Sequence, residues 1–141
     1  MWLYQGKEFT SDDIGDYIGF VYLLTNVETQ KKYIGKKILK STRKLPPLKG
    51  KKRRRTKIVE SDWETYYGSS VETMALVEEK GGDVFKREIL HLCLTKGVMS
   101  YLELKEQMDR DVLLRDDYYN GICQAKIHKT HVYGKIDIDR S

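Results

Sequence analysis

The stretch from Ile18 to Leu39, IGFVYLLTNVETQKKYIGKKIL, decides the fold. Its first part, residues 18–25, is rich in β-branched, aromatic and aliphatic residues, which is typical of a buried strand. A polar, turn-like segment over residues 26–32 separates this run from a second apolar run over residues 32–39. The pattern predicts a β-hairpin.

Residues downstream of the hairpin predict two helices and a third strand. Ser-x-x-Glu capping boxes begin at Ser69 and Ser100, and they predict helices that end near Lys80 and Leu114. Between the two helices, residues 83–93 (DVFKREILHLC) alternate at first and become apolar later, which favours a strand.

Three segments have no regular pattern. Residues 1–17 carry few periodic signals, so we expect an irregular N-terminal arm. Residues 40–62 contain two prolines, a glycine and a run of cations, which favour a long loop. Residues 122–141 form a mixed C-terminal segment.

The length and composition indicate one globular domain. A chain of 141 residues can form one core but not two, and its 40% apolar and 33% charged residues are ordinary values. No apolar run approaches the ~20 residues of a membrane helix, and the N-terminus does not resemble a signal peptide. Two cysteines are too few to crosslink a small secreted domain. We therefore expect a reduced cytoplasmic protein with no membrane partner.

Positive charge is concentrated in one part of the chain. Between Lys31 and Lys57 there are 14 Lys or Arg residues and no Asp or Glu, whereas the rest holds 12 basic and 21 acidic residues. A solvated charged surface is the ordinary explanation for a cluster of basic residues. A strip that binds a polyanion explains this cluster better, because its cations would otherwise only repel one another. The expected nucleic-acid contacts are Lys37, Lys51, Lys52, Arg53, Arg54, Arg55 and Lys57.

Two tyrosines occupy matching places on the predicted hairpin. Tyr22 ends the triplet FVY, and Tyr33 begins the triplet YIG after ten intervening residues. On adjacent strands both side chains could project toward the same region. A phenol has an ordinary pKa near ~10, and neighbouring cations such as Lys36 and Lys37 would favour its phenolate. Taken alone, the pair fits a packing role in a sheet at least as well as a role in proton transfer.

The ordered motifs resemble the GIY-YIG nuclease family, and in particular its phage-encoded, homing-type (Seg-like) members. The resemblance spans residues 18–121 and departs from the family in its first triplet, where the glycine is displaced to Gly19. The matching features, in order, are GFVY…KYIGKK, Lys36, Arg43, the stretch SDWETYYGSS at residues 61–70, Glu103 and the pair Tyr119-Asn120.

The resemblance implies an α+β fold in which helices flank a small three-stranded antiparallel sheet, with a long basic loop after the first hairpin. It also implies a metal-dependent endonuclease that hydrolyses phosphodiester bonds in double-stranded DNA. Such an enzyme would act as a monomer or as a transient dimer on DNA. A phage-encoded member would act in the host-cell cytoplasm.

The resemblance also assigns site residues. Tyr22 would be the general base for the attacking water and Tyr33 would position that water, or the two would exchange roles. Lys36 and an arginine would stabilise charge on the phosphate. Arg43 matches the arginine by spacing, but Arg53, Arg54 or Arg55 could fold back into this role. Asn120 would hold the late turn or contact the phosphate.

Glu103 is the implied metal ligand, and Glu106 and Asp109 on the same predicted helix are weaker alternatives. A single carboxylate completed by water and substrate oxygens suits Mg²⁺, with Mn²⁺ as the alternative. From local sequence alone, Glu103 fits better as the third residue of the capping box that begins at Ser100.

Other interpretations stay open at this stage. The same scaffold could serve as a non-catalytic nucleic-acid-binding module, or as an adaptor whose basic loop binds an acidic protein. Cys123, His128 and His131 have a loosely zinc-like spacing that lacks a fourth ligand, which Cys93 or His91 would have to supply. His91 lies in an apolar run and fits better as a core histidine. The aromatic residues just after the basic segment would either stack on bases or anchor the basic loop. They are Trp63, Tyr66 and Tyr67.

Overall fold

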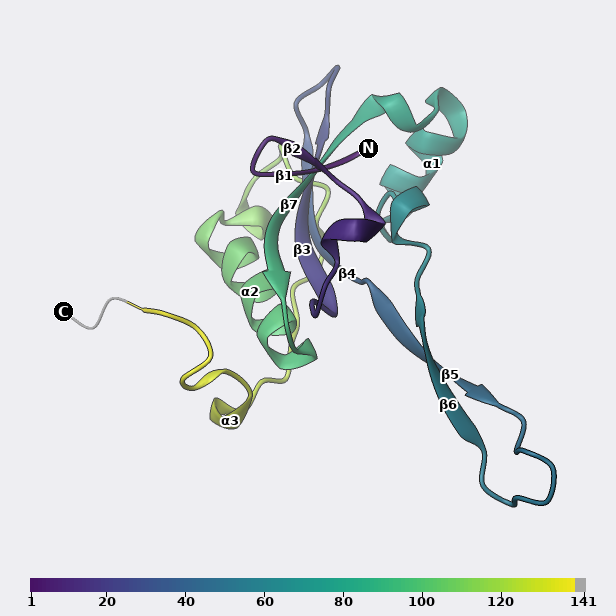
Figure 1. Cartoon of the computed structure of the whole chain (residues 1–141). Helices are drawn as coiled ribbons and strands as arrows, with labels where there is room; N and C mark the ends of the chain where they lie inside the picture. Colours follow the sequence, from purple (N-terminus) through teal and green to yellow (C-terminus); the bar gives the residue numbers. More distant parts are fainter. Residues whose placement is uncertain (139–141) are drawn as a thin grey trace.

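The computed structural model describes residues 1–138 and shows an α+β architecture (Figure 1). A five-stranded mixed sheet has the order β2-β1-β7-β3-β4, and a separate two-stranded ribbon is formed by β5 and β6. The strands and helices are β1 (Trp2–Tyr4), β2 (Lys7–Phe9), β3 (Gly19–Asn26), β4 (Lys32–Ile38), β5 (Lys40–Leu45), β6 (Arg55–Glu60), α1 (Val71–Lys80), β7 (Phe85–Cys93), α2 (Lys96–Asp109) and α3 (Lys129–Val132).

The predicted hairpin of β3 and β4 is confirmed. The two strands are antiparallel, and the turn between them begins at Asn26, whose Oδ1 accepts hydrogen bonds from the backbone N–H groups of Glu28 (2.9 Å) and Thr29 (3.2 Å). β3 is almost entirely buried because the sheet is covered on both faces. Figure 1 shows α1 and α2 on opposite sides of the sheet, and each contributes side chains to a different hydrophobic cluster.

The expected three-stranded antiparallel sheet is wrong, because residues 1–17 contribute two further strands. β1 pairs in parallel with β7 and antiparallel with β2. Trp2 is only 2% exposed, and its Nε1 donates a hydrogen bond to the carbonyl of Trp63 (2.8 Å). Strands of three residues joined at Gln5-Gly6 are too short to show a period-2 pattern, so the segment resembles an irregular arm in sequence.

Both predicted helices exist, but neither begins with its predicted capping box. α1 follows Ser70 instead of Ser69. α2 begins four residues before Ser100, and Thr95 caps it by accepting a hydrogen bond from the N–H of Val98 (3.2 Å). Glu103 therefore lies in the middle of α2, where it cannot cap the helix. The helix ends at Asp109, and Val112–Leu114 forms a separate 3-10 turn.

The basic segment is not a loop. β5 and β6 pair from Lys40 opposite Glu60 to Leu45 opposite Arg55, and they form a ribbon that projects from the body of the molecule (Figure 1). Prolines and consecutive cations obscure the strand pattern in the sequence. In addition, neither face of the ribbon packs on a core, so no hydrophobic alternation is required of it.

The third strand is confirmed as β7, which lies between β1 and β3. The C-terminal segment contains the short helix α3. Within residues 1–138, no helix combines the length and the apolar composition needed to cross a membrane.

The burial of Trp2 leads to a stability prediction. Its ring packs edge-on against those of Phe20 and Tyr22, with centroids 4.8 and 5.4 Å away. We expect Trp2→Ala to lower the free energy of unfolding by about 3–5 kcal/mol in chemical denaturation, because a large cavity would open in the core. Tyr133→Ala, at a side chain 68% exposed, serves as the control and should change it by less than about 0.5 kcal/mol. Equal effects of the two substitutions would show that β1 is not part of the folded core.

Candidate active site

The candidate site is built around the pairing of Tyr22 with Gly35. Tyr22 on β3 lies directly opposite Gly35 on β4, which is the outermost strand of the sheet. A methyl group added at Gly35 would overlap the phenol of Tyr22. The glycine of the YIG triplet thus lets this buried phenol lie across β4 toward the edge of the sheet.

Three tyrosines gather on this face of the sheet. The ring centroid of Tyr22 lies 6.2 Å from that of Tyr33 and 5.9 Å from that of Tyr66. The hydroxyls of Tyr33 and Ser69 are hydrogen-bonded at 3.2 Å. The role of Tyr66 beside Tyr22 was missed in the sequence, because a residue 44 positions away from Tyr22 in an irregular segment gives no local signal.

Lys36 and Glu103 approach from the opposite face. Side chains alternate along a strand, so Tyr33, Gly35 and Lys37 share one face of β4 and Lys36 points to the other, toward α2. The Lys36 Nζ donates a hydrogen bond to the Ser100 Oγ (2.9 Å) and lies 3.9 Å from the Glu103 Oε1. The edge of β4 is therefore where the phenols of one face meet the carboxylate and ammonium groups of the other.

Both tyrosines of the hairpin hold their protons more tightly than a free phenol. Burial raises the pKa of Tyr22 well above its usual range, and the neighbouring Tyr66 and Tyr33 add to the effect. Burial also raises the pKa of Tyr33, although its hydrogen bond with Ser69 partly offsets this. The expectation that the lysines favour a phenolate is thus not met in the free protein.

The two lysines are engaged elsewhere. The Lys37 Nζ lies 2.6 Å from the Asp62 Oδ1 and makes a cation–π contact with Tyr66, 4.2 Å from its ring centroid. The Lys36 ammonium is directed to Ser100 and Glu103. Because nearby carboxylates offset both positive charges, burial dominates the ionisation of Tyr22.

Glu103 has the properties of a cation-binding carboxylate. Its side chain is only 14% exposed, and burial raises its pKa even though Lys36 acts in the opposite direction. Among residues 1–138, no side chain or backbone group donates a hydrogen bond to this carboxylate. A desolvated carboxylate without donors is suited to a positive ion. No group of three or more His, Cys, Asp or Glu side chains in this part of the chain converges to complete a metal site, so water and substrate oxygens would have to supply the other ligands.

Asn120 acts as a clamp on the edge strand. Its Oδ1 accepts from the backbone N–H of Ile34 (3.0 Å), and its Nδ2 donates to the carbonyl of the same residue (2.8 Å). The amide therefore replaces the backbone of a neighbouring strand, and it is only 8% exposed. Of its two expected roles, the geometry favours holding the late turn.

A hollow of about 300 Å³ opens beside Tyr33, next to this clamp. The other residues that line it are Ser69, Ser70, Tyr119, Asn120, Gly121 and Ile122. Hydroxyl groups and the Asn120 amide share its wall with aromatic rings and Ile122.

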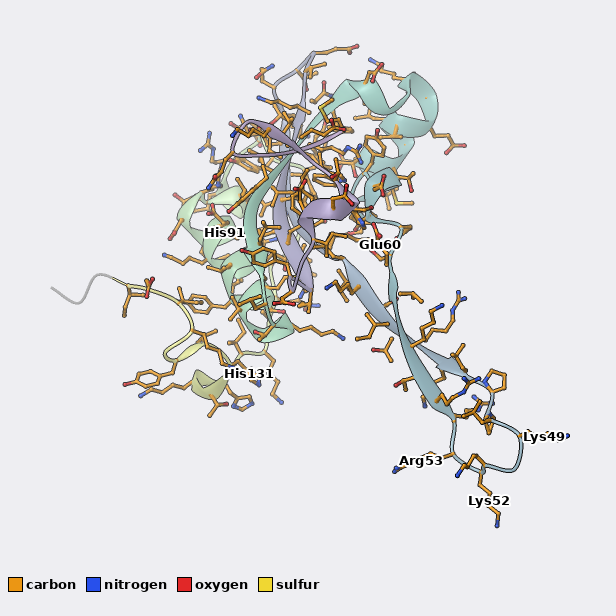
Figure 2. All side chains as sticks on the ribbon, in the orientation of Figure 1. Lys49, Lys52, Arg53, Glu60, His91 and His131 are labelled. Atoms are coloured by element: carbon orange, nitrogen blue, oxygen red, sulfur yellow. The ribbon has the colours of Figure 1, made fainter. Side chains whose placement is uncertain are left out.

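The expected arginines do not lie beside the tyrosines. Arg43 is exposed on β5, and seven residues of largely extended chain, about 23 Å, separate it from Lys36. Arg53 points outward from the tip of the ribbon, as do Lys49 and Lys52 (Figure 2). The same projecting ribbon carries Arg54 and Arg55, which are also exposed.

Arg87 is the buried arginine on this side of the sheet. It donates hydrogen bonds to the carbonyls of Glu64 (2.8 Å) and Tyr66 (3.0 Å). Its guanidinium also stacks between the rings of Trp2 and Tyr67, at 4.8 and 4.1 Å from their centroids. Arg87 therefore supports the segment that carries Tyr66, and this function gave no signal in the sequence.

The residues of the zinc alternative have other partners. His131 accepts a hydrogen bond through its Nδ1 from the backbone N–H of His128 (3.2 Å). His91, expected to be a core histidine, is partly exposed beside α2 and lies 2.8 Å from the Glu106 Oε1 (Figure 2).

Comparison with known protein families gave one match. Residues 2–123 match the family described as "Putative endonuclease segE, GIY-YIG domain". Neither the curated proteins nor the solved structures gave a match.

Two glutamates on α2 should respond to neutralisation in opposite directions. Because the pKa of Glu103 is raised in the folded state, its ionised form costs stability at pH values above the ordinary carboxyl pKa of ~4.3. We expect Glu103→Gln to raise the free energy of unfolding at pH 7 by roughly 1 kcal/mol. This gain should disappear as the pH falls below about 4.

Glu106→Gln is the matched control. Burial would raise the pKa of Glu106, but hydrogen bonds with Arg110 (2.9 Å) and His91 (2.8 Å) outweigh it and lower the pKa. Ionised Glu106 therefore stabilises the fold above the ordinary carboxyl pKa, and Glu106→Gln should destabilise the protein at pH 7. Denaturation curves at pH 4 and pH 7 measure both effects. A loss of stability in Glu103→Gln at pH 7 would contradict the assignment of a carboxylate that Lys36 compensates only in part.

Proposed function

The chain belongs to the SegE-type GIY-YIG endonuclease family, and on that premise we propose that it hydrolyses phosphodiester bonds of double-stranded DNA at the edge of β4. GIY-YIG nucleases generally use a divalent metal ion, and we propose Mg²⁺ here, with Mn²⁺ as a substitute. The proposal extends to a phage-encoded enzyme of the homing type, which acts in the host cytoplasm as a monomer or as a transient dimer on DNA.

One observation carries the proposal. The phenols of Tyr22 and Tyr33 reach the outermost strand from one face, while Lys36 and Glu103 reach it from the other. Phosphodiester hydrolysis needs a group that accepts a proton from water, and positive charge beside the phosphate. The edge of β4 offers both within one small region of the surface.

Tyr22 is proposed as the proton acceptor and Tyr33 as the group that positions the water. In the free protein Tyr22 is a neutral phenol, so it has to lose its proton before it can accept another. A dication held by Glu103 would supply the positive charge that favours the phenolate and offsets charge on the phosphate. Tyr66, in edge-on contact with Tyr22, holds the phenol in place.

Lys36 is proposed to stabilise charge on the phosphoryl oxygens. Its ammonium is within 3.9 Å of Glu103 and its side chain is 38% exposed, so it is accessible to substrate. Asn120 contributes indirectly, because it fixes the backbone of β4 between Tyr33 and Gly35. The arginines of the ribbon, including Arg43, are assigned to DNA binding because they lie away from the tyrosines.

Cleavage of supercoiled plasmid tests the enzymatic function. We expect nicking or linearisation with Mg²⁺ and none with EDTA. Tyr22→Phe and Glu103→Gln should reduce the rate by about 10²–10⁴-fold, since each removes a group that acts on the reacting atoms. Tyr4→Phe and Glu106→Gln, which change the same residue types outside the site, should retain most of the rate. If the wild type binds DNA but cleaves none of several substrates with Mg²⁺ or Mn²⁺, the chain is a non-catalytic binding module instead.

The salt dependence of DNA binding tests the role of the ribbon. We expect the triple variant Lys51→Ala, Lys52→Ala, Arg53→Ala to bind DNA more weakly. The slope of log affinity against log salt concentration should be smaller in magnitude by up to about 2.7 for this variant. Each lost phosphate contact reduces the magnitude of the slope by about 0.9.

A second triple variant controls for net charge. Lys80→Ala, Lys86→Ala, Lys105→Ala removes the same charge from outside the ribbon, at lysines that pair with acidic neighbours. Binding titrations over a range of salt concentrations should give it a slope close to that of the wild type. Equal slopes for the two triple variants would refute a specific role of the ribbon.

A further inference from the structure

The β5–β6 ribbon is a direct and firmly anchored extension of the strand that carries the site. Only Leu39, which is fully buried, separates β4 from β5. The Leu39 N–H donates to the carbonyl of Ile18 (2.7 Å), and its carbonyl accepts from the N–H of Ser61 (2.8 Å). Glu60, labelled at the root of the ribbon in Figure 2, accepts a hydrogen bond from the indole of Trp63 (2.6 Å). The base of the ribbon is thereby fixed to the core.

The two faces of the ribbon differ in chemistry. In an antiparallel pair, residues directly opposite each other lie on the same face. The pairs Arg43–Lys57 and Leu45–Arg55 therefore share one face, defined here as the cationic face, and it carries three positive charges. The pairs Thr42–Ile58 and Lys44–Thr56 define the mixed face, which carries one positive charge.

The cationic face lies on the tyrosine side where the chain enters the ribbon. Leu39, at the bend between β4 and β5, is buried in the same core cluster as Tyr22, and Arg43 and Leu45 follow it at even spacing. The mixed face is turned toward α2 instead. Thr42 and Ile58 of this face, with Lys40 and Ser41 at the root of the ribbon, line a cleft of about 710 Å³ together with Thr95 at the start of that helix.

The ribbon has no packing partner within residues 1–138. Almost all of its side chains are exposed, and Ile58 is 70% exposed. An isolated two-stranded ribbon is marginally stable, and adjacent cations weaken it further. The absence of acidic residues from Lys31 to Lys57 makes a second copy of the ribbon a poor partner and a polyanion a good one.

We propose that the ribbon reads DNA sequence by entering the major groove, with its cationic face against the base edges and its tip, residues 46–54, on the phosphates. This inference rests on the proposed function, because it takes double-stranded DNA as the substrate. The major groove, about 12 Å wide, admits a two-stranded ribbon. Arginines such as Arg43 and Arg55 can pair with guanine through two hydrogen bonds.

The direct connection of β4 to β5 sets the distance between reading and cutting. Eight residues separate Gly35 from Arg43, which is at most about 26 Å at the rise of a strand, because the chain bends at Leu39. This equals about 8 base pairs of B-form DNA at ~3.4 Å per base pair. The bases that the ribbon reads therefore lie within about one helical turn of the cut.

Selection from a random duplex library tests the inference without requiring cleavage. DNA bound in EDTA is recovered and sequenced for the wild type and for Arg43→Ala and Arg55→Ala on the cationic face. Thr42→Ala and Lys44→Ala on the mixed face are matched controls, and Lys51→Ala with Lys52→Ala tests the tip. A second experiment maps the cut ends of the selected sequences with Mg²⁺.

The wild type should select a short base pattern centred within about 8 base pairs of the cut. Each cationic-face variant should lose roughly tenfold or more of the preference at one position of this pattern. The tip variant should weaken binding to all sequences alike, and the mixed-face variants should keep the preference. Random selection by the wild type, or a pattern that the cationic-face variants leave unchanged, would overturn the inference.

The two experiments separate this inference from the proposed function. Cleavage without any contribution of the ribbon to sequence preference would refute the inference and leave the endonuclease intact. A ribbon-dependent base pattern without cleavage would refute the endonuclease and uphold the inference.

Discussion

The register of β3 against β4 is the constraint on which the rest of the molecule depends. It places Tyr22 opposite Gly35, the residue whose missing side chain leaves room for the phenol. A shift by one residue would turn Tyr22 to the opposite face of the sheet and bury a different set of side chains. Asn26 fixes this register at the turn, and Asn120 fixes it at the edge by binding both backbone groups of Ile34.

The site places polar chemistry in surroundings that oppose ionisation. Burial raises the pKa values of Tyr22, Tyr33 and Glu103 alike, and Lys36 only partly compensates for Glu103. The ionised forms of these groups are therefore disfavoured in the free protein. A bound cation would favour the ionised forms, so the buried carboxylate of Glu103 suits a role in function better than a role in stability. By contrast, Glu106 on the same helix has two hydrogen-bond partners, as expected of a carboxylate with a structural role.

Charge is separated in space as well as in sequence. The cations between Lys31 and Lys57 begin in the site with Lys36 and Lys37, and they continue along a ribbon that leaves the body of the molecule (Figure 2). One continuous stretch of chain thus carries both the tyrosine edge and the proposed DNA-binding surface. The buried Leu39 between them anchors the base of the ribbon to the core.

Local patterns in the sequence determined the hairpin, the third strand, the approximate extent of α1 and the position of the cationic segment, because each depends on neighbouring residues. The ordered motifs also identified the family, which the match over residues 2–123 confirms. Only the tertiary structure decided the parallel pairing of β1 with β7, since more than 80 residues separate the two strands and three-residue strands carry no period. It also decided that Glu103 lies inside α2 and that Tyr66 stands beside Tyr22. The same motif Ser-x-x-Glu fits a cap or a helix interior, and contacts between distant segments leave no trace in local sequence. The ribbon could not be predicted from the sequence, because a strand pair that buries no side chains has no hydrophobic alternation.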